Sequence, residues 1–507
     1  MFKPSISEPN LFENSELALC KRALQKLDDP KSWFNQFFED VTLNVNEEVF
    51  RPLFKSGNMG APNSSIRILV AMSCIKEGFR WSDETLFDMV DLNLMTRRAL
   101  GLFNMTDKAP SIDTYYMFRR RIVEYDANNG TDLMNECFKG ITGKQCLTYE
   151  VHGKRVRMDS KLVGSNIASY SRYRIIVTAL KEWYKNVDAS KLGKNLVRSL
   201  AKYIEDDPEK TQYRQNSTEI NNRLEELGKI LYKIVVKSKV GNDMLKRVFN
   251  DQYDVAKGTA TPKDKKDISA KSLQNPYDPD AQYRSKGDQK VKGYSVNITE
   301  TCDEGVSVGE GEPAKPVLNL ITGVQVEGAT AADNEYLQEA GSQAEEVTGT
   351  RPETINADGA YQSESNRSFC EKMGIELVTS GFQGKQGQLD ITRDGDEIKV
   401  IDRTTGKELP TRSTGKGWSV TLADGKERYL TEKNVESATA RKKFEQIPLE
   451  ERNRRNNVEA AMFQVSLHTR NNKTRYRGLE KHRMWAVSRC LWMNFRRINI
   501  YRTAVCQ

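Results

Sequence analysis

The sequence predicts an α/β fold in which one mixed β-sheet carries helical and β-rich additions. Two observations support this class. Runs of alternating apolar residues, typical of half-buried strands, occur at 155–160, 293–299, 317–326 and 375–380, and a further strand ends at Asp358. Segments 333–347 and 363–373 have the apolar spacing of helices. The expected order around the sheet is therefore three strands, helix, strand, helix, strand.

Residues 1–150 are expected to form a helical N-terminal domain. Ile66, Leu69 and Val70 form one apolar stripe, and a further helix should begin at Ser111. That helix carries Arg119, Arg120 and Arg121. Short helices with an aromatic and arginine-rich segment suit DNA binding, although a simple helical bundle explains the same pattern.

Two insertions interrupt the predicted sheet domain. Residues 171–285 are rich in helix formers and end in a proline-containing return loop at 259–284. Residues 386–435 carry turn signals at short intervals between alternating runs, which predicts a small antiparallel sheet. The core would then consist of 151–170, 286–385 and 436–507.

Three carboxylates stand at the ends or flanks of these elements. Asp159 and Asp358 lie in or directly after strands, and Glu459 lies in a helical pattern with buried-type residues at Val458, Ala461, Met462 and Val465. Carboxylate oxygens suit Mg²⁺, and a pair of such ions can hold the attacking and leaving oxygens of a phosphodiester. The pattern favours metal-dependent phosphoryl transfer. Taken singly, Asp358 could be a turn residue and Glu459 an exposed helix residue.

Composition narrows the class of protein. The chain has 507 residues and a net charge of +8, and from Arg441 to the end it holds 16 Lys and Arg against 5 Glu, so this tail is a candidate phosphate-contacting surface. A solvated helix face is the alternative interpretation of this basic tail.

No apolar run approaches the length of a membrane span or signal peptide, so we expect a cytoplasmic protein without a membrane partner. Eight scattered cysteines and three histidines favour free thiols over a zinc site.

Several segments together resemble the DDE transposases of bacterial insertion sequences, in the branch with a β-rich insertion before the catalytic Glu. They are residues 110–121, 158–163, 292–296, 357–361, 457–463 and 476–480. The resemblance implies an RNase H-like mixed-sheet catalytic core with the helical N-terminal domain, helical insertion and small antiparallel β insertion described above.

By this resemblance, Asp159, Asp358 and Glu459 would be the catalytic, metal-binding residues, with Mg²⁺ as cofactor and Mn²⁺ as a substitute. Arg455, four residues before Glu459, matches an Arg-x-x-x-Glu signature. The chain departs from the family pattern in two places, where Arg452 replaces a Tyr and Ser466 replaces a Lys. Basic groups that could replace that lysine are Arg470 and Lys473, and Glu480 is the rival third carboxylate.

The implied function is a transposase that binds the terminal repeats of its element, cleaves at the ends and joins the 3′-hydroxyls to target DNA. Double-stranded DNA and a second copy of the chain on DNA would be its partners, at the nucleoid. DNA contacts are expected from Arg119, Arg120, Arg121, Arg455, Arg470 and Lys473. Trp418 would either stack on a base or fill the core of the inserted sheet. The alternatives are a decayed DNA-binding scaffold and an RNase H-like nuclease without strand transfer.

Overall fold

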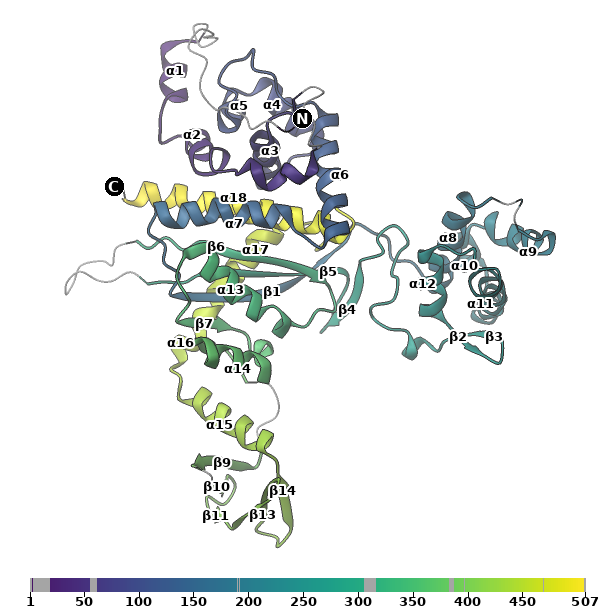
Figure 1. The fold of residues 1–507 in the computed structure, drawn as a ribbon, viewed down its shortest axis with the longest axis vertical. Coiled ribbons are helices and arrows are strands. Elements are labelled where there is room, and N and C mark those ends of the chain that lie inside the picture. The colour runs from purple at the N-terminus through teal and green to yellow at the C-terminus, as the bar shows by residue number, and fades with distance from the viewer. Residues whose placement is uncertain are drawn as a thin grey trace.

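A computed structural model describes residue 2 and residues 19–54, 62–188, 190, 192–304, 316–382, 387–395, 397–467 and 469–505. A central mixed sheet lies between an N-terminal helical domain and two insertions that project from it (Figure 1). His468, one of the three histidines of the sequence, lies outside the described residues. None of the described helices has the length and apolar content needed to cross a membrane.

The central sheet has the strand order β4-β5-β1-β7-β8, and β6 also pairs with β5. Its strands are β1 (Arg155–Gly164), β4 (Gln282–Lys286), β5 (Gln289–Thr301), β6 (Ile321–Gly328), β7 (Thr354–Ala357) and β8 (Glu376–Thr379). Strands β1, β5 and β6 pair antiparallel, whereas β1, β7 and β8 pair parallel. The mixed α/β class is thus confirmed.

Strand β4 was not predicted, because its residues overlap the end of the return loop expected at 259–284. Its residues are mostly polar and none is buried, so no hydrophobic alternation marks it. The strand forms because its chain turns back at Gly287, which has a φ of 58°, and pairs with the start of β5. Backbone pairing therefore supplies an element that side-chain pattern does not reveal.

Both faces of the sheet are covered. One face buries Val156 and Met158 of β1 against helix α13 (Leu337–Thr348). The other face packs against α17 (Val458–Ser466) and α18 (Leu479–Val505), and Val458, Ala461, Met462 and Val465 are buried as predicted. Helix α14 (Glu364–Met373) follows β7, as expected.

The N-terminal region is helical, as predicted, and shares one hydrophobic core with α18. Its helices are α1 (Lys21–Leu27), α2 (Trp33–Phe37), α3 (Ile66–Phe79), α4 (Asp83–Leu92), α5 (Leu94–Leu100), α6 (Ile112–Asn129) and α7 (Leu133–Thr148). Ser111 caps α6 by accepting a hydrogen bond from the backbone of Thr114. Figure 1 shows α7 and α18 running side by side between this domain and the sheet.

The helical insertion has a hydrophobic core of its own. It comprises α8 (Arg172–Lys185), α9 (Lys194–Ile204), α10 (Pro208–Arg214), α11 (Ser217–Tyr232) and α12 (Asp243–Gln252), followed by the hairpin β2 (Tyr253–Ala256) and β3 (Thr259–Pro262). The hairpin falls partly in the predicted loop. It forms because Lys257 and Gly258 take left-handed conformations, which make a tight turn.

The second insertion is not one antiparallel sheet but two, each with three strands. One contains β9 (Leu389–Asp394), β10 (Glu397–Asp402) and β11 (Glu408–Leu409), and the other β12 (Thr411–Thr414), β13 (Gly417–Thr421) and β14 (Glu427–Leu430). Pro410, which has no amide donor, separates β11 from β12 where the chain passes between the sheets. Helix α15 (Glu432–Gln446) packs on both sheets, so the expected boundary at residue 435 falls inside this helix.

Helix α18 also corrects the interpretation of the basic tail. Most of its length is buried, and four of its arginines bind within the protein, whereas Arg496 is exposed. Arg489 donates to backbone carbonyls of α3, Arg497 pairs with the buried Glu300, and Arg502 pairs with Asp40. The charge surplus of this helix therefore stabilises contacts between domains and leaves few of its cations for DNA.

Candidate functional site

Four charged residues follow one face of β1 because side chains alternate along a strand. They are Arg155, Arg157, Asp159 and Lys161, and all are only partly buried, whereas the alternating Val156 and Met158 are fully buried. The segment that crosses this face contains α16 (Leu449–Asn453), the turn Arg454–Asn457 and α17. Each of the four meets that segment, in the pairs Arg155–Glu451, Arg157–Arg454, Asp159–Arg455 and Lys161–Ser466.

The three carboxylates predicted from the sequence converge on one guanidinium group. Arg455 Nη2 lies 2.6 Å from Asp159 Oδ2 and 4.0 Å from Asp358 Oδ2, and its Nη1 lies 3.9 Å from Glu459 Oε1. Exposure of the side chains rises from 14% at Asp159 to 39% at Asp358 and 65% at Glu459. The cluster is therefore anchored at its buried side and open to solvent on the other.

The sheet register explains why the two aspartates meet. Strands β1 and β7 are parallel, with Arg157 opposite Asn356. Continued by two residues, this register brings Asp159 opposite Asp358, which directly precedes the turn Gly359–Tyr361 after β7. Glu459 arrives separately, in the first turn of α17, whose apolar face packs on the sheet.

Charge interactions hold the cluster together. Burial raises the pKa of Asp159 above its usual value, although attraction to Arg455 acts in the opposite direction. For Arg455, burial lowers the pKa, but the attraction of Asp159, Asp358 and Glu459 outweighs it, so the net shift is upward. Three carboxylates facing one cation leave an excess of negative charge, which favours a further cation.

No group of three His, Cys, Asp or Glu side chains is close enough to hold a metal ion in the part of the chain that the structure describes. At the carboxylate cluster the guanidinium of Arg455 occupies the space between the acids. The donor set itself fits Mg²⁺ or Mn²⁺, which prefer carboxylate oxygens. The cysteines within the described ranges are free thiols.

The rival carboxylate, Glu480, lies in the first turn of α18 and pairs with Arg483 at 3.1 Å. Burial raises its pKa, with Arg483 opposing the shift. Glu459, by contrast, lies next to Arg455, the residue that also contacts Asp159 and Asp358. The geometry thus favours Glu459 as the companion of the two aspartates.

The three arginines of α6 differ in their surroundings. Arg119 lies over the rings of Tyr115 and Tyr476, at 5.4 and 5.1 Å from their centroids. Arg120 is exposed and reaches Glu124, whereas Arg121 is exposed beside the ring of Phe54. Arg120 and Arg121 are therefore placed for contact with a ligand, while Arg119 joins α6 to the segment before α18.

The remaining predicted DNA contacts are scattered. Arg470 and Lys473 form the ends of a tight turn after α17, and Lys473 Nζ donates to the carbonyl of Ile167. Trp418 is 8% exposed and belongs to the core of the second insertion, which favours the packing role over base stacking in this conformation. None of these side chains joins the carboxylate cluster.

Sequence reasoning assigned no role to Lys161, whose Nζ lies 2.6 Å from Ser466 Oγ. Ser466 is the position at which the resemblance calls for a lysine. The sequence did contain a signal for Lys161: it follows Asp159 by two residues in a predicted strand, which places both side chains on one face.

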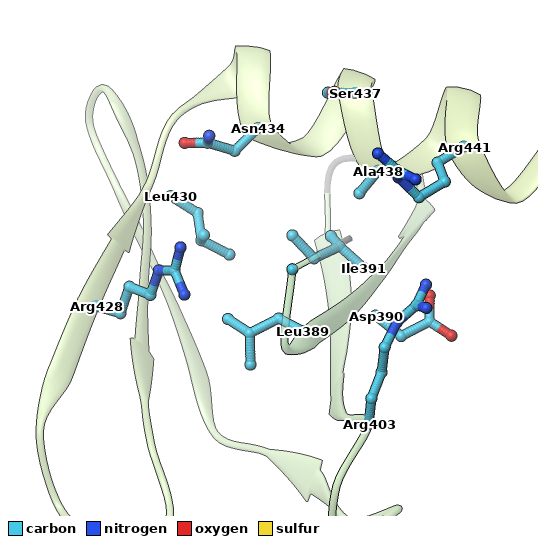
Figure 2. Close-up of a pocket in the computed structure, with 11 residues that line it drawn as sticks. Leu389, Asp390, Ile391, Arg403, Arg428, Leu430, Asn434, Ser437, Ala438 and Arg441 are labelled. Atoms are coloured by element: carbon cyan, nitrogen blue, oxygen red, sulfur yellow. The ribbon is translucent and has the colours of Figure 1, made fainter. Parts of the chain in front are cut away.

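A separate cavity of about 230 Å³ lies in the second insertion, away from the carboxylates. Figure 2 shows residues of α15 and of the two small sheets lining it. Apolar side chains, three guanidinium groups and one carboxylate line it; the lining residues include Leu389, Ile391, Leu430, Ala438, Arg403, Arg428, Arg441 and Asp390.

Comparison with protein families gave two matches. Residues 22–121 match a family described as "Transposase domain (DUF772)", and residues 413–499 match one described as "Transposase DDE domain". The second segment contains both Glu459 and Glu480 but neither aspartate of the cluster. No curated protein and no solved structure gave a significant match.

Proposed function

We propose that this chain, a DDE transposase of an insertion sequence, cuts DNA at the ends of its element and joins the 3′-hydroxyls to target DNA. The observation that carries the proposal is the convergence of Asp159, Asp358 and Glu459 on Arg455. The three acids come from a strand, a strand end and a helix that lie far apart in the sequence, and their meeting is what a phosphoryl-transfer site requires.

The arrangement of the sheet supports an RNase H-like core. Three antiparallel strands, β6, β5 and β1, are followed across the sheet by the parallel strands β7 and β8. Helix α13 covers one face, and α17 covers the other. Asp159 and Asp358 lie just beyond the last residues at which β1 and β7 pair with each other, Arg157 and Asn356.

Asp159, Asp358 and Glu459 are the residues that would hold Mg²⁺ or Mn²⁺. The bound ion would supply charge stabilisation at the phosphate and activation of the attacking oxygen. Glu459 is the most exposed of the three, while Asp159 accepts a hydrogen bond from the Ser160 amide. Arg455 would exchange its carboxylates for a phosphate, which its planar guanidinium binds through two N–H donors.

A plasmid excision assay with the ends of the element tests this function. Asp159→Ala, Asp358→Ala and Glu459→Ala should each abolish cleavage while leaving DNA binding intact, because catalysis here depends on charge placed at the phosphate. Glu480→Ala is the matched control and should keep activity. Normal cleavage by Glu459→Ala would remove that residue from the site.

Strand transfer needs its own measurement. Pre-cleaved ends with a free 3′-hydroxyl should be joined to a target plasmid by the wild type and by no variant of the three acids. Cleavage without joining would instead favour a nuclease, and binding without cleavage would favour a decayed scaffold. Two DNA ends held by a homodimer should appear as one complex in light scattering, with the mass of two chains and two DNA ends together.

A further inference from the structure

Lys161 lies beside the carboxylate cluster but forms no ion pair with any residue that the structure describes. It follows Asp159 by two residues on β1, so both side chains stand on the same face of the strand. Two residues of a strand span about 7 Å. This separation is comparable with that of successive phosphates along one DNA strand.

The ammonium of Lys161 is held by α17. Its Nζ donates to Ser466 Oγ at 2.6 Å, and Ser466 Oγ in turn donates to the carbonyl of Met462 at 3.0 Å. Glu459 stands two helical turns before Ser466, on the same helix. Where α17 packs on β1, Lys161 therefore faces Ser466, and Asp159 and Glu459 both approach Arg455.

Lys161 differs from the arginines on this face of β1 because its partner, Ser466, is neutral, whereas theirs are acidic. Arg155 pairs with Glu451, Arg157 with Glu300, and Arg455 with the three acids. Across the described ranges, no carboxylate lies within ion-pair distance of Lys161, whose neighbour Ser466 is neutral. A half-buried ammonium with only a neutral partner gains from the arrival of an anion.

We propose that Lys161 binds the DNA phosphate next to the one that is cut, on the flanking side of the junction, with Ser466 holding its ammonium in position. The inference rests on the proposed function, since it takes the carboxylate cluster as the place of cleavage. Lys161 is then a strand-positioning residue that sets the register of the DNA on the acids.

Binding measured without divalent metal separates this role from catalysis. One duplex runs from the end of the element through the cleavage junction into flanking DNA, and a second stops at the last base pair of the element. The logarithm of the binding constant is followed against the logarithm of salt concentration for the wild type and for Lys161→Met. Each phosphate contact contributes about 0.9 to this slope on duplex DNA.

Lys161→Met should lower the slope by about 0.9 on the junction duplex and leave it unchanged on the short duplex. Lys161→Arg should retain the wild-type slope on both. Lys154→Met is the matched control, because Lys154 precedes β1 and pairs with Glu353, and it should change neither slope.

Three results would overturn the proposal: a wild-type slope for Lys161→Met on the junction duplex, an equal loss on both duplexes, or a wild type that binds neither. If Lys161 only ties β1 to α17, Lys161→Met and Ser466→Ala would lower the melting temperature alike without changing any slope. Because the assay involves no cleavage, an inactive enzyme that shows the expected slopes would refute the proposed function but not the phosphate contact.

Discussion

Arg455 and Asp159 form a 2.6 Å ion pair that joins the turn before α17 to strand β1. Both side chains are 14% exposed, so the pair is better protected from solvent than most surface ion pairs. Because the same guanidinium also faces Asp358 and Glu459, it balances part of the negative charge of the cluster.

Arg455→Ala should make the protein more responsive to Mg²⁺. Without the guanidinium, three neighbouring carboxylates repel one another, which lowers the melting temperature in the absence of divalent metal. Mg²⁺ should then raise the melting temperature of the variant more than that of the wild type. At 100 times the dissociation constant, Mg²⁺ bound only to the folded variant would add about 2.7 kcal/mol to its free energy of unfolding.

Thermal unfolding with and without Mg²⁺ measures the difference. Arg155→Ala serves as control, because Arg155 pairs with Glu451 and not with the cluster, and it should respond to Mg²⁺ like the wild type. An equal Mg²⁺ response in Arg455→Ala and the wild type would contradict the view that these acids form a cation site.

Substitution of Arg119 should affect mainly the stability of the protein, and substitution of Arg120 should affect mainly DNA binding. Arg119→Met removes contacts to two aromatic rings, each worth about 0.5–2 kcal/mol, so its melting temperature should fall while the salt slope of DNA binding stays the same. Arg120 is 68% exposed, and Arg120→Gln should change stability by less than about 0.5 kcal/mol but lower that slope. A reversed pattern would show that Arg119 is the DNA contact.

Two helical glycines should respond oppositely to alanine. A methyl group at Gly78 of α3 would overlap the indole ring of Trp492 on α18, so Gly78→Ala should destabilise the protein by about 1–3 kcal/mol despite its better helix propensity. Gly140 of α7 has open space around it, and Gly140→Ala should stabilise by about 0.5–1 kcal/mol. Chemical unfolding of both variants checks this pair, and a destabilising Gly140→Ala would be inconsistent with the packing described.

Asp40 should make the docking of the N-terminal domain depend on pH. Burial raises the pKa of its carboxyl from 3.8 to about 6, although Arg502 and the hydroxyl of Tyr149 oppose the shift. Because the folded pKa is the higher one, its contribution to stability is complete below about pH 4 and is lost as the pH rises through about 6.

Asp40→Asn lacks this titration, so its stability relative to the wild type should improve from pH 4 to pH 7. The gain should be at most about 3 kcal/mol, from 1.36 kcal/mol per pKa unit. Melting temperatures at both pH values measure it, with the exposed Asp243→Asn as control. A difference between Asp40→Asn and the wild type that stays constant with pH would show that Asp40 has an ordinary pKa.

The core strands and helices could be predicted because their residues carry the periodicity of the element they form. The alternation from Arg155 and the helical spacing around Val458 and Val465 are local signals, and the structure confirms both elements. Elements without such signals were missed. Strand β4 is polar and exists through pairing with β5, and the second insertion divides into two sheets at Pro410.

The sequence by itself determined which chemistry the chain offers, since carboxylates at strand ends and in a helix can be read from residue type and spacing. Only the tertiary structure decided how these groups are used, because ion pairs depend on distances between segments far apart in the chain. Parallel pairing of β1 with β7 set Asp159 level with Asp358, and the crossing of α17 brought Arg455 and Glu459 to them. The same crossing gave Lys161 a neutral partner, and the burial of α18 turned a basic tail into an internal support.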